Sequence, residues 1–368
     1  MIVVNFKNYA ESFNKNALKL AKICEKISAK YKVDIIVAPN FLDIKEIAKN
    51  CKIKVFAQHI DPIENLGSFT GSIIASSLKM LGIKGTLINH SEKPLSIKEI
   101  KKCVEICKNL SLTSVVLSSK ISQIKKIVKF KPDYVAYEPK ELIGGDISVS
   151  TAKPKIIKRA FDICRKNDVE LLVGAGIKTA LDVKKSRILG ARGVLVSSGI
   201  VKAKNPAEVL KEFALNLKIK GFFIGRFQPL HLGHVYAINQ ALKLFDEVIV
   251  GIGSAQYYNQ PRNPYTANLR EKMIKLVFKN RKNLKIVKVP DFNNDEKWTE
   301  YCIKNFDFDV VFTASNHVKK CFEGKKEVIE PLLLKPRNIY RGTYIRKLIK
   351  ENNKKWKELV PKEVVGLL

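Results

Sequence analysis

The chain has 368 residues, of which 46% are apolar, and this length predicts two domains of about 150 to 200 residues, each with its own core. No stretch approaches the roughly 20 uninterrupted apolar residues of a membrane span, and the first residues lack a signal peptide's pattern, so we expect a cytoplasmic protein with no membrane contact. The net charge of +32 results from 56 Lys and 11 Arg against 35 acidic residues. Because the lysines are dispersed, they predict a solvated surface that attracts anions, and a nucleic-acid partner is the less favoured alternative.

Short runs rich in valine and isoleucine recur along the first half of the chain. Segments with helical periodicity separate most of them, for example residues 17–28 and 97–110. The runs lie at residues 2–6, 34–39, 54–58, 85–90, 114–119, 134–139, 170–175 and 193–198. Regular alternation of strands and helices predicts a parallel sheet covered by helices. Eight such units within residues 1–218 fit a closed (β/α)8 barrel.

Polar residues and glycines follow most of these strands. They are Asn5 and Lys7, Gln58 and His59, His90, Glu138, Gly174 to Gly176, and Ser197 to Gly199. In a (β/α)8 barrel the carboxyl ends of all strands open onto one face, so residues far apart in the sequence meet there. The sequence therefore predicts one polar site at the mouth of the barrel.

The motifs in residues 1–218 resemble the short archaeal form of triosephosphate isomerase. NFK, GSFTG, INHSEK, YEPKELIGG, GAGI and SSG occur in the order found in that family. The resemblance implies interconversion of glyceraldehyde 3-phosphate and dihydroxyacetone phosphate on a TIM barrel, without a cofactor. Such a reaction requires a base for a carbon-bound proton and an electrophile for the developing enediolate oxygen.

The resemblance assigns the catalytic roles residue by residue. Glu138 would be the base, and His90 the neutral electrophile, with its pKa lowered by a helix N-terminus as is known for this enzyme family. Lys7 would place a positive charge at the carbonyl oxygen. Asn5 would hold Lys7 and the substrate, and Glu92 would support the region around Lys7.

The substrate phosphate is expected among backbone amides on the opposite side of the site. The implied substrate-binding residues are Gly144, Gly174, Gly176, Ser197 and Ser198. Residues 139–148 are typical of the family's lid, which closes over the phosphate. Its usual G-x-G ending reads Gly144-Gly145-Asp146 here, and because an acidic side chain near a phosphate is unfavourable, we expect slower or leakier turnover.

Thr70 lies in the GSFTG segment, which in this family reaches into a neighbouring subunit and braces Asn5 and Lys7 there. The resemblance therefore implies a homo-oligomer through the barrel, with Thr70 at the neighbour's substrate site. A barrel that serves only as an oligomerisation scaffold is the non-catalytic alternative.

The second half, residues 219–368, also alternates strands and helices, beginning directly after Lys218 without a Gly-, Ser- or Pro-rich linker. Expected strands lie at 221–225, 246–253, 284–290 and 309–315, and expected helices at 234–245, 266–278 and 298–306. This pattern predicts a Rossmann-like, doubly wound sheet.

Residues 225–234 combine a strand end, a tight turn and a helix start. His231 and His234 are three residues apart, so both can face one phosphate group from the first helical turn. They could instead bind a metal, but no third ligand has fitting spacing, and we expect no protein-bound metal. The seven cysteines contain no C-x-x-C pair, which favours reduced, buried thiols.

This H-x-G-H motif is that of nucleotidyltransferases, and the further motifs resemble the archaeal nicotinamide-nucleotide adenylyltransferase. They are residues 252–256, residues 262–267, Trp298 and residues 341–346. The resemblance implies that nicotinamide mononucleotide attacks the α-phosphorus of ATP, supplied with Mg²⁺, to form NAD and pyrophosphate. Trp298 would stack on the pyridinium ring, or else be a core aromatic.

The resemblance also implies which residues bind ATP. His231, His234, Arg226 and Arg346 would hold the phosphates, and Thr343 would cap the helix that presents Arg346. The remaining nucleotide-binding residues would be Gly225, Phe227, Gln228, Gly233, Ser254, Arg262 and Arg270.

Departures from the family pattern occur where the acceptor substrate is expected. Arg341 stands where a small hydroxyl residue is usual, and Tyr344 where a carboxylate is common. Asn268 and Leu269 replace the usual pair before Arg270. Adenylylation of another phosphate acceptor, such as phosphopantetheine, is therefore the alternative for the second domain.

Overall fold

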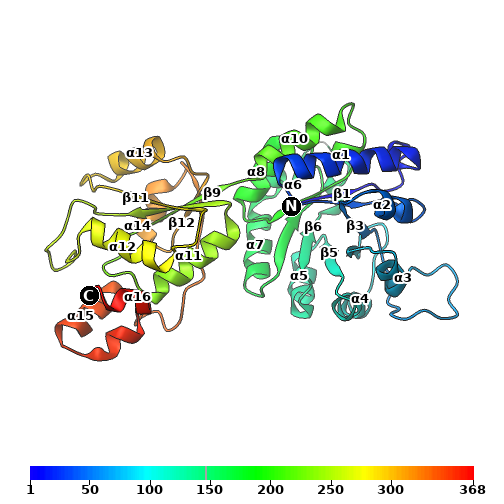
Figure 1. Ribbon diagram of the computed structural model, residues 1–368. Helices are drawn as coiled ribbons and strands as arrows, with labels where there is room; N and C mark the ends of the chain where they lie inside the picture. The colour runs from blue at the N-terminus through cyan, green and yellow to red at the C-terminus, as the bar shows by residue number, and fades with distance from the viewer. Residues whose placement is uncertain (146) are drawn as a thin grey trace. The chain divides into compact units, whose positions relative to one another are not determined.

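The computed structural model describes residues 1–145 and 147–368, which form two compact units, Met1–Lys218 and Ile219–Leu368 (Figure 1). The expectation for Asp146 lies outside the described residues. No helix in the described part of the chain is both long and apolar enough to cross a membrane. All seven cysteines are free thiols, and five of them are buried.

The first unit is a closed barrel of eight parallel strands, paired in sequence order, so the predicted (β/α)8 fold is confirmed. Its strands are β1 (Ile2–Asn5), β2 (Ile35–Ala38), β3 (Lys54–Ala57), β4 (Gly85–Ile88), β5 (Thr113–Ser118), β6 (Tyr134–Tyr137), β7 (Glu170–Val173) and β8 (Gly193–Val196). Most strands end one or two residues earlier than predicted. The polar residues of the motifs therefore begin the loops beyond the strands.

Helices surround this barrel (Figure 1). They are α1 (Lys15–Tyr31), α2 (Ile44–Asn50), α3 (Ala75–Met80), α4 (Ile97–Asn109), α5 (Ile121–Ile127), α6 (Val149–Ala152), α7 (Pro154–Arg165), α8 (Ala180–Ile188), α9 (Ser198–Val201) and α10 (Pro206–Asn216), with 3-10 turns η1 (Ala10–Ser12), η2 (Val128–Phe130) and η3 (Lys140–Leu142). A capping box of Ser96 and Glu99 begins α4, which buries Ile100 and Val104.

Apolar side chains fill the inside of the barrel. Val3, Ile36, Phe56, Leu87 and Val115 belong to one buried cluster there. A packed interior is not a channel, so substrate has access only at the ends of the strands. The candidate site therefore lies at the mouth of the barrel and not within it.

The second unit is an open sheet of five parallel strands in the order β11-β10-β9-β12-β13, which confirms the predicted doubly wound fold. The strands are β9 (Lys220–Gly225), β10 (Glu247–Ile252), β11 (Leu284–Lys288), β12 (Val310–Phe312) and β13 (Glu327–Ile329). β13 was not predicted from the sequence. The strand order reverses between β9 and β12, and ligands of such sheets bind at the carboxyl end of this switch point.

The helices of the second unit are α11 (Leu232–Leu244), α12 (Ala267–Val277), α13 (Asp295–Asn305), α14 (Asn316–Phe322), α15 (Gly342–Lys350) and α16 (Lys362–Val365), with the 3-10 turn η4 (Lys354–Glu358). Aromatic side chains pack together against one face of the sheet. The ring of Phe222 stacks on Phe308 with centroids 4.7 Å apart, and Phe322 meets Phe222 edge-on at 6.5 Å.

Candidate functional sites

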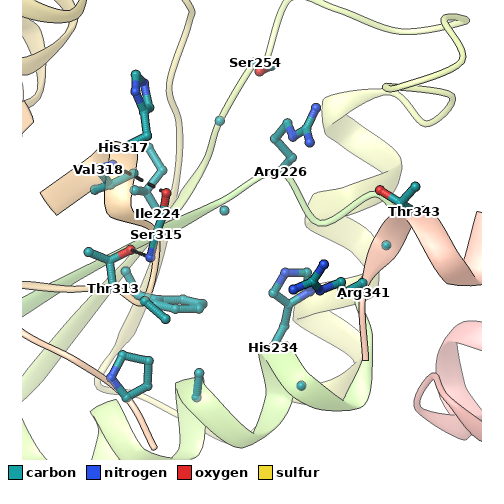
Figure 2. Close-up of a pocket in the computed structure, with 18 of the residues that line it drawn as sticks. Ile224, Arg226, His234, Ser254, Thr313, Ser315, His317, Val318, Arg341 and Thr343 are labelled. Atoms are coloured by element: carbon teal, nitrogen blue, oxygen red, sulfur yellow. Dashed lines mark hydrogen bonds between the residues drawn. The ribbon is translucent and has the colours of Figure 1, made fainter. Parts of the chain in front are cut away.

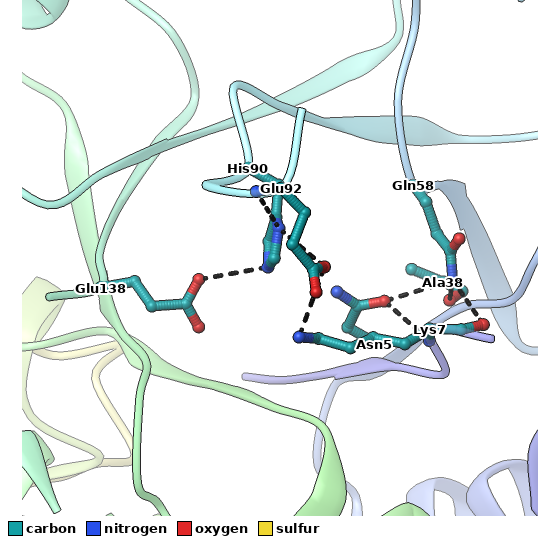
Figure 3. A network of polar contacts seen from close by, with 7 residues as sticks. All are labelled: Asn5, Lys7, Ala38, Gln58, His90, Glu92 and Glu138. Carbon is teal, nitrogen blue, oxygen red and sulfur yellow. Dashed lines mark hydrogen bonds and ion pairs between the residues drawn. The ribbon is translucent and has the colours of Figure 1, made fainter. Parts of the chain in front are cut away.

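The end of β1 carries two polar residues that are fixed by the neighbouring strands (Figure 3). The side-chain oxygen of Asn5 accepts hydrogen bonds from the Lys7 backbone N–H at 3.0 Å and from Gln58 Nε2 at 3.2 Å. Gln58 Nε2 also lies 3.0 Å from the carbonyl oxygen of Ala38. Lys7 has a φ of 49°, which is unusual for a residue with a side chain. These contacts hold Lys7 in that conformation.

His90 follows β4, and its two ring nitrogens have different environments. Nδ1 accepts the backbone N–H of Glu92 at 3.2 Å and also lies 3.3 Å from the Glu92 carboxylate. The backbone donor favours the neutral tautomer that carries its proton on Nε2. Burial, and then the positive charge of Lys7, lower the pKa of His90. The ring is therefore neutral near pH 7. The Glu92 carboxylate lies 3.5 Å from Lys7 Nζ.

The cause of this lowered pKa differs from the expectation. His90 is not at a helix N-terminus: a turn follows it, in which the Lys93 N–H donates to the His90 carbonyl oxygen at 2.9 Å. The next helix, α4, begins only at Ile97. Burial and Lys7 produce the effect that was attributed to a helix.

Glu138 follows β6, and its carboxylate faces His90. Glu138 Oε2 lies 3.6 Å from His90 Nε2, and both residues are buried. Neither atom has a hydrogen-bond partner among the described residues. Burial raises the pKa of Glu138 to about 7. A buried base that titrates near neutral pH thus faces a neutral N–H donor across a gap that a substrate carbon and oxygen could fill.

Gly174 makes room for this carboxylate. A Cβ at position 174 would lie 2.7 Å from Glu138 Oε1 and 3.2 Å from the Leu195 carbonyl oxygen. Gly174 was expected to bind the substrate phosphate together with Gly144 and Gly176. Gly174 instead lies next to the Glu138 carboxylate. It is not one of the described residues that line the small cavity of the site.

That cavity, of about 40 Å³, is lined by Asn5, Lys7, His90 and Glu138. Its lining also includes Tyr9 and Lys178, and the residues predicted for the phosphate region, Gly144, Gly176, Ser197, Ser198 and Gly199. Tyr9 and Lys178 were not predicted. Lys178 could have been found, because it directly follows the GAGI motif, whereas nothing in the sequence marks Tyr9.

The lid segment contributes Ile143 and Gly144 to the cavity wall. Gly144 has a φ of +74°, where a side chain would be strained, and Lys153 forms an ion pair with Glu141 at the base of the segment. A Cβ on Gly176 would lie 2.3 Å from the Ile147 carbonyl oxygen, so the lid packs closely on the GAGI turn.

Thr70 lies on an exposed loop and, within the described residues, does not line this cavity. The side chains of Leu66 and Phe69 on the same loop are 59% and 50% exposed. An exposed apolar loop of this kind is typical of a surface that contacts another protein chain.

In the second unit His231 caps the first helix after β9. Its Nδ1 accepts the His234 backbone N–H at 3.3 Å, so the proton of the neutral ring is on Nε2. The two imidazole rings stack with centroids 3.6 Å apart, and Phe227 packs edge-on against His234 at 4.8 Å. Burial lowers the pKa of His231 to about 4 and that of His234 well below its usual value. Both rings are neutral and offer N–H donors to an anion.

A cavity of about 780 Å³ opens at the switch point of the sheet (Figure 2). The predicted residues that line it are Gly225, Arg226, His231, Gly233, His234, Ser254, Trp298 and Thr343. Arg341, which the sequence places where the acceptor is expected, lines it as well, and so do Arg337 and Tyr340, which were not predicted as site residues. The volume is that of a drug-sized ligand site, and the arginines give its wall positive charge.

Trp298 lies between the aromatic core and the cavity. Its ring meets Phe322 edge-on at 5.7 Å and packs against the aromatic core. Trp298 also lines the cavity. One tryptophan can therefore join the core and present an aromatic face to a ligand.

Arg270 differs from the expectation that it binds nucleotide. The side chain is fully buried and donates to the carbonyl oxygens of Arg226 at 2.9 Å, Gly253 at 2.8 Å and Ser254 at 3.2 Å. Burial lowers the pKa of Arg270 to about 10, which leaves it protonated at neutral pH. Its donors hold two loops together and do not face the cavity.

We expect Arg270→Ala to destabilise the second unit by about 3 kcal/mol or more, because it leaves several buried carbonyl oxygens without donors. Both tryptophans of the chain, Trp298 and Trp356, belong to this unit. A thermal melt followed by tryptophan fluorescence therefore reports on it alone. An unchanged midpoint would show that water replaces the guanidinium.

Three more predicted nucleotide-binding residues support the site from outside the cavity. Gln228 exchanges two hydrogen bonds with the backbone of Tyr265, at 3.0 and 2.9 Å. Arg346 donates to the Gln228 carbonyl oxygen at 2.8 Å. Phe227 is fully buried. Arg262 is exposed on its loop, and none of these four side chains is among the described residues that line the cavity.

Thr343 does not cap α15 as predicted. The helix begins at Gly342, so Arg341 is its N-cap residue, and no side chain caps it. Thr343 instead faces the cavity from the first turn. Asp291 was missed: its carboxylate accepts a hydrogen bond of 2.5 Å from Ser254 Oγ and lines the same cavity.

Comparison with protein families finds two matches. Residues 1–214 match the family model described as triosephosphate isomerase, and residues 222–348 match the one described as cytidylyltransferase-like. The two matches correspond to the two compact units.

Curated relatives match the barrel along nearly their whole length. A triosephosphate isomerase of Methanocaldococcus jannaschii is 46% identical over 214 residues, which are 58% of this chain and 97% of that protein. Triosephosphate isomerases of Methanothermus fervidus and Saccharolobus solfataricus are 44% and 42% identical, with 58% of this chain and 96% and 94% of the relatives covered.

Proposed function

The chain belongs to the triosephosphate isomerase family through its first 214 residues and carries a cytidylyltransferase-like domain at residues 222–348, and on this premise we propose that it is a bifunctional enzyme. The barrel interconverts glyceraldehyde 3-phosphate and dihydroxyacetone phosphate. The second unit transfers the adenylyl group of ATP to nicotinamide mononucleotide and releases pyrophosphate.

The observation that carries the first activity is the buried pair of Glu138 and His90. Glu138 takes a proton from the carbon beside the substrate carbonyl and returns it to the neighbouring carbon. His90 Nε2 donates its hydrogen bond to the oxygen on which negative charge develops. The neutral ring suits this role, because its Nε2–H is less acidic than that of an imidazolium and can donate a hydrogen bond without giving up its proton. Nε2 lies 3.6 Å from the Glu138 carboxylate.

Lys7 supplies the positive charge for the developing enediolate, and Asn5 and Gln58 hold it in place. The substrate phosphate binds at Gly144, Gly176 and the turn at Ser197, where backbone amides favour anions. The buried Ser197 Oγ has no hydrogen-bond partner in the described chain, so it is available to the phosphate. Closure of the lid excludes water from the enediolate.

Steady-state isomerisation of glyceraldehyde 3-phosphate by the purified full-length chain tests this activity. Turnover that depends on Glu138 supports it. An inactive, correctly assembled chain would favour the alternative in which the barrel is only an oligomerisation scaffold.

The second activity is supported by the neutral His231 and His234 with Arg226 at the cavity. In the proposed reaction the acceptor's phosphate oxygen bonds to the α-phosphorus of ATP as the bond to the β-phosphate oxygen breaks. The two imidazole N–H groups and Arg226 bind the phosphates and compensate their charge. ATP would enter as its magnesium complex, which requires few protein ligands.

The acceptor is proposed to be nicotinamide mononucleotide, with Trp298 against its pyridinium ring. Arg341, which lines the cavity at the start of α15, is a second residue that could select the acceptor. Nicotinamide mononucleotide and phosphopantetheine, each offered with ATP and Mg²⁺, test the assignment. Pyrophosphate release with nicotinamide mononucleotide alone supports this assignment. Release with phosphopantetheine alone would show that phosphopantetheine is the acceptor.

We also propose that the barrel acts as a homo-oligomer through the loop of Leu66, Phe69 and Thr70. Phe69→Asp is expected to shift sedimentation toward the monomer and to lower isomerase activity at least tenfold, because a desolvated carboxylate opposes apolar contact. Leu42→Asp, on a residue that is 81% exposed, is the control. A wild-type chain that sediments as a fully active monomer would contradict this proposal.

A further inference from the structure

Three side chains with metal-binding atoms lie together on two helices of the second unit. Asp295 is the first residue of α13, and His317 and Cys321 are four residues apart on α14, which places them on one helix face. Their ligand atoms all lie within 4.8 Å of one another. This cluster was not predicted, because Asp295 is more than 20 residues away in sequence and neither helix carries a metal motif.

The distances within the cluster are near those of a tetrahedral zinc site, and one of them lies within that range. His317 Nε2 lies 3.4 Å from Asp295 Oδ1 and 4.0 Å from Cys321 Sγ. With zinc bonds of about 2.0 to 2.3 Å, neighbouring ligand atoms of a tetrahedron are about 3.3 to 3.6 Å apart. The thiol must move closer to the imidazole to enter that range, and all three ligand atoms already lie within 4.8 Å of one another.

We propose that Asp295, His317 and Cys321 bind one Zn²⁺ ion, with solvent in the fourth position. A thiolate, an imidazole and a carboxylate are a ligand set that zinc accepts and magnesium does not, because magnesium prefers oxygen ligands. The site is therefore separate from the magnesium that accompanies ATP. Zinc binding at this site does not depend on the proposed adenylyl transfer, so an experiment can disprove either proposal without the other.

The surroundings allow a metal to enter. The side chains of His317 and Asp295 are 66% and 68% exposed. Cys321 is partly buried, like Cys51, whereas the other five cysteines are buried. An exposed histidine–aspartate ion pair alone would stabilise the protein little, and it would not require a thiol beside it.

The metal would join α13 to α14 at the edge of the large cavity, whose wall includes Asp295, His317 and Trp298. Because Trp298 is three residues after Asp295 on α13, a metal bond at the start of that helix fixes this part of the wall. Zinc is therefore expected to stabilise the second unit by binding its folded state.

The test is titration of the full-length, metal-free chain with Co²⁺, which reports on its ligands spectroscopically. We expect one Co²⁺ per chain, with visible bands of tetrahedral cobalt and a near-ultraviolet thiolate-to-cobalt charge-transfer band, and displacement by Zn²⁺. Cys321→Ser removes the charge-transfer band, and His317→Gln weakens Zn²⁺ binding at least about tenfold. The matched control, Cys51→Ser on the barrel, leaves both unchanged.

A second readout is the tryptophan-fluorescence melt. Added Zn²⁺ raises the midpoint of the wild-type chain and of Cys51→Ser, but not that of Cys321→Ser. A charge-transfer band that survives Cys321→Ser, octahedral cobalt without any such band, or equal Zn²⁺ affinity in the wild type and His317→Gln would each overturn the proposal.

Discussion

Replacement of Glu138 by glutamine is expected to lower the kcat of the isomerase by about 10² to 10⁴-fold, the usual contribution of a positioned general base. Glutamine keeps the size of the side chain but cannot accept the carbon-bound proton. The KM is expected to change little, since the proposed phosphate contacts involve other residues of the cavity. Adenylyl transfer by the same preparation is the internal control, because its proposed residues belong to the other unit.

The pH dependence of kcat/KM is a sharper form of the same prediction. Glu138 must be ionised to act as a base, and its pKa is raised to about 7. Isomerase activity of the free enzyme therefore falls as the pH drops below about 7, and His90, with its lowered pKa, does not limit it there. A profile that is flat from pH 5 to pH 8 would contradict the raised pKa.

The raised pKa also predicts a gain in stability from the inactive variant. The folded pKa is about 7, above the ordinary 4.5, so the contribution of Glu138 to stability is complete below pH 4.5 and is lost as the pH rises through 7. Glu138→Gln removes that loss. Hydrogen exchange in barrel peptides is expected to be slower in the variant at pH 8 and equal to the wild type at pH 4.5.

Replacement of His231 by asparagine is expected to lower the rate of adenylyl transfer by about 10² to 10³-fold, as is typical when one preorganised donor to a developing charge is removed. Asparagine is a good N-cap residue, so its side-chain oxygen can still accept the His234 N–H. The first turn of α11 stays capped. What is lost is the imidazole N–H in the cavity.

His231→Ala separates chemistry from capping. It removes both the donor and the cap, and it is expected to lower the stability of the second unit by about 1 kcal/mol relative to His231→Asn. Transfer rates are equally low in both variants if the donor is what matters. If only His231→Ala is slow, His231 acts by shaping the helix, and the proposed contact with phosphate is wrong. Isomerase activity of both variants serves as the control.

The strands of the barrel and their polar ends were predictable because two local signals coincide there. Runs of branched apolar residues mark buried parallel strands, and the residues after them converge by topology alone. Asn5, His90 and Glu138 meet as predicted for that reason. β13 was missed, since three residues carry no periodicity, and its pairing with β12 depends on contacts distant in sequence.

Arg270 and Gln228 show why the nucleotide contacts of the second unit could not all be predicted from the sequence. Both lie close in sequence to phosphate-binding motifs, and an arginine there suggests an anion, but in the structure both side chains donate to backbone carbonyl oxygens. Whether such donors reach a ligand or a backbone carbonyl depends on tertiary burial, which sequence position does not report. Thr343 was misplaced because the start of a helix is uncertain by a residue or two.

Gly174 is a position of the barrel where the smallest substitution would reach the proposed catalytic base. Its φ lies outside the left-handed region, so a larger residue would meet no strain of that kind. The obstacle is that a methyl group would lie 2.7 Å from the Glu138 carboxylate and 3.2 Å from the Leu195 carbonyl oxygen. The smallest possible change, the addition of one carbon, would push the base out of line with the substrate. The reaction thus depends as much on an empty space behind the base as on the atoms in front of it.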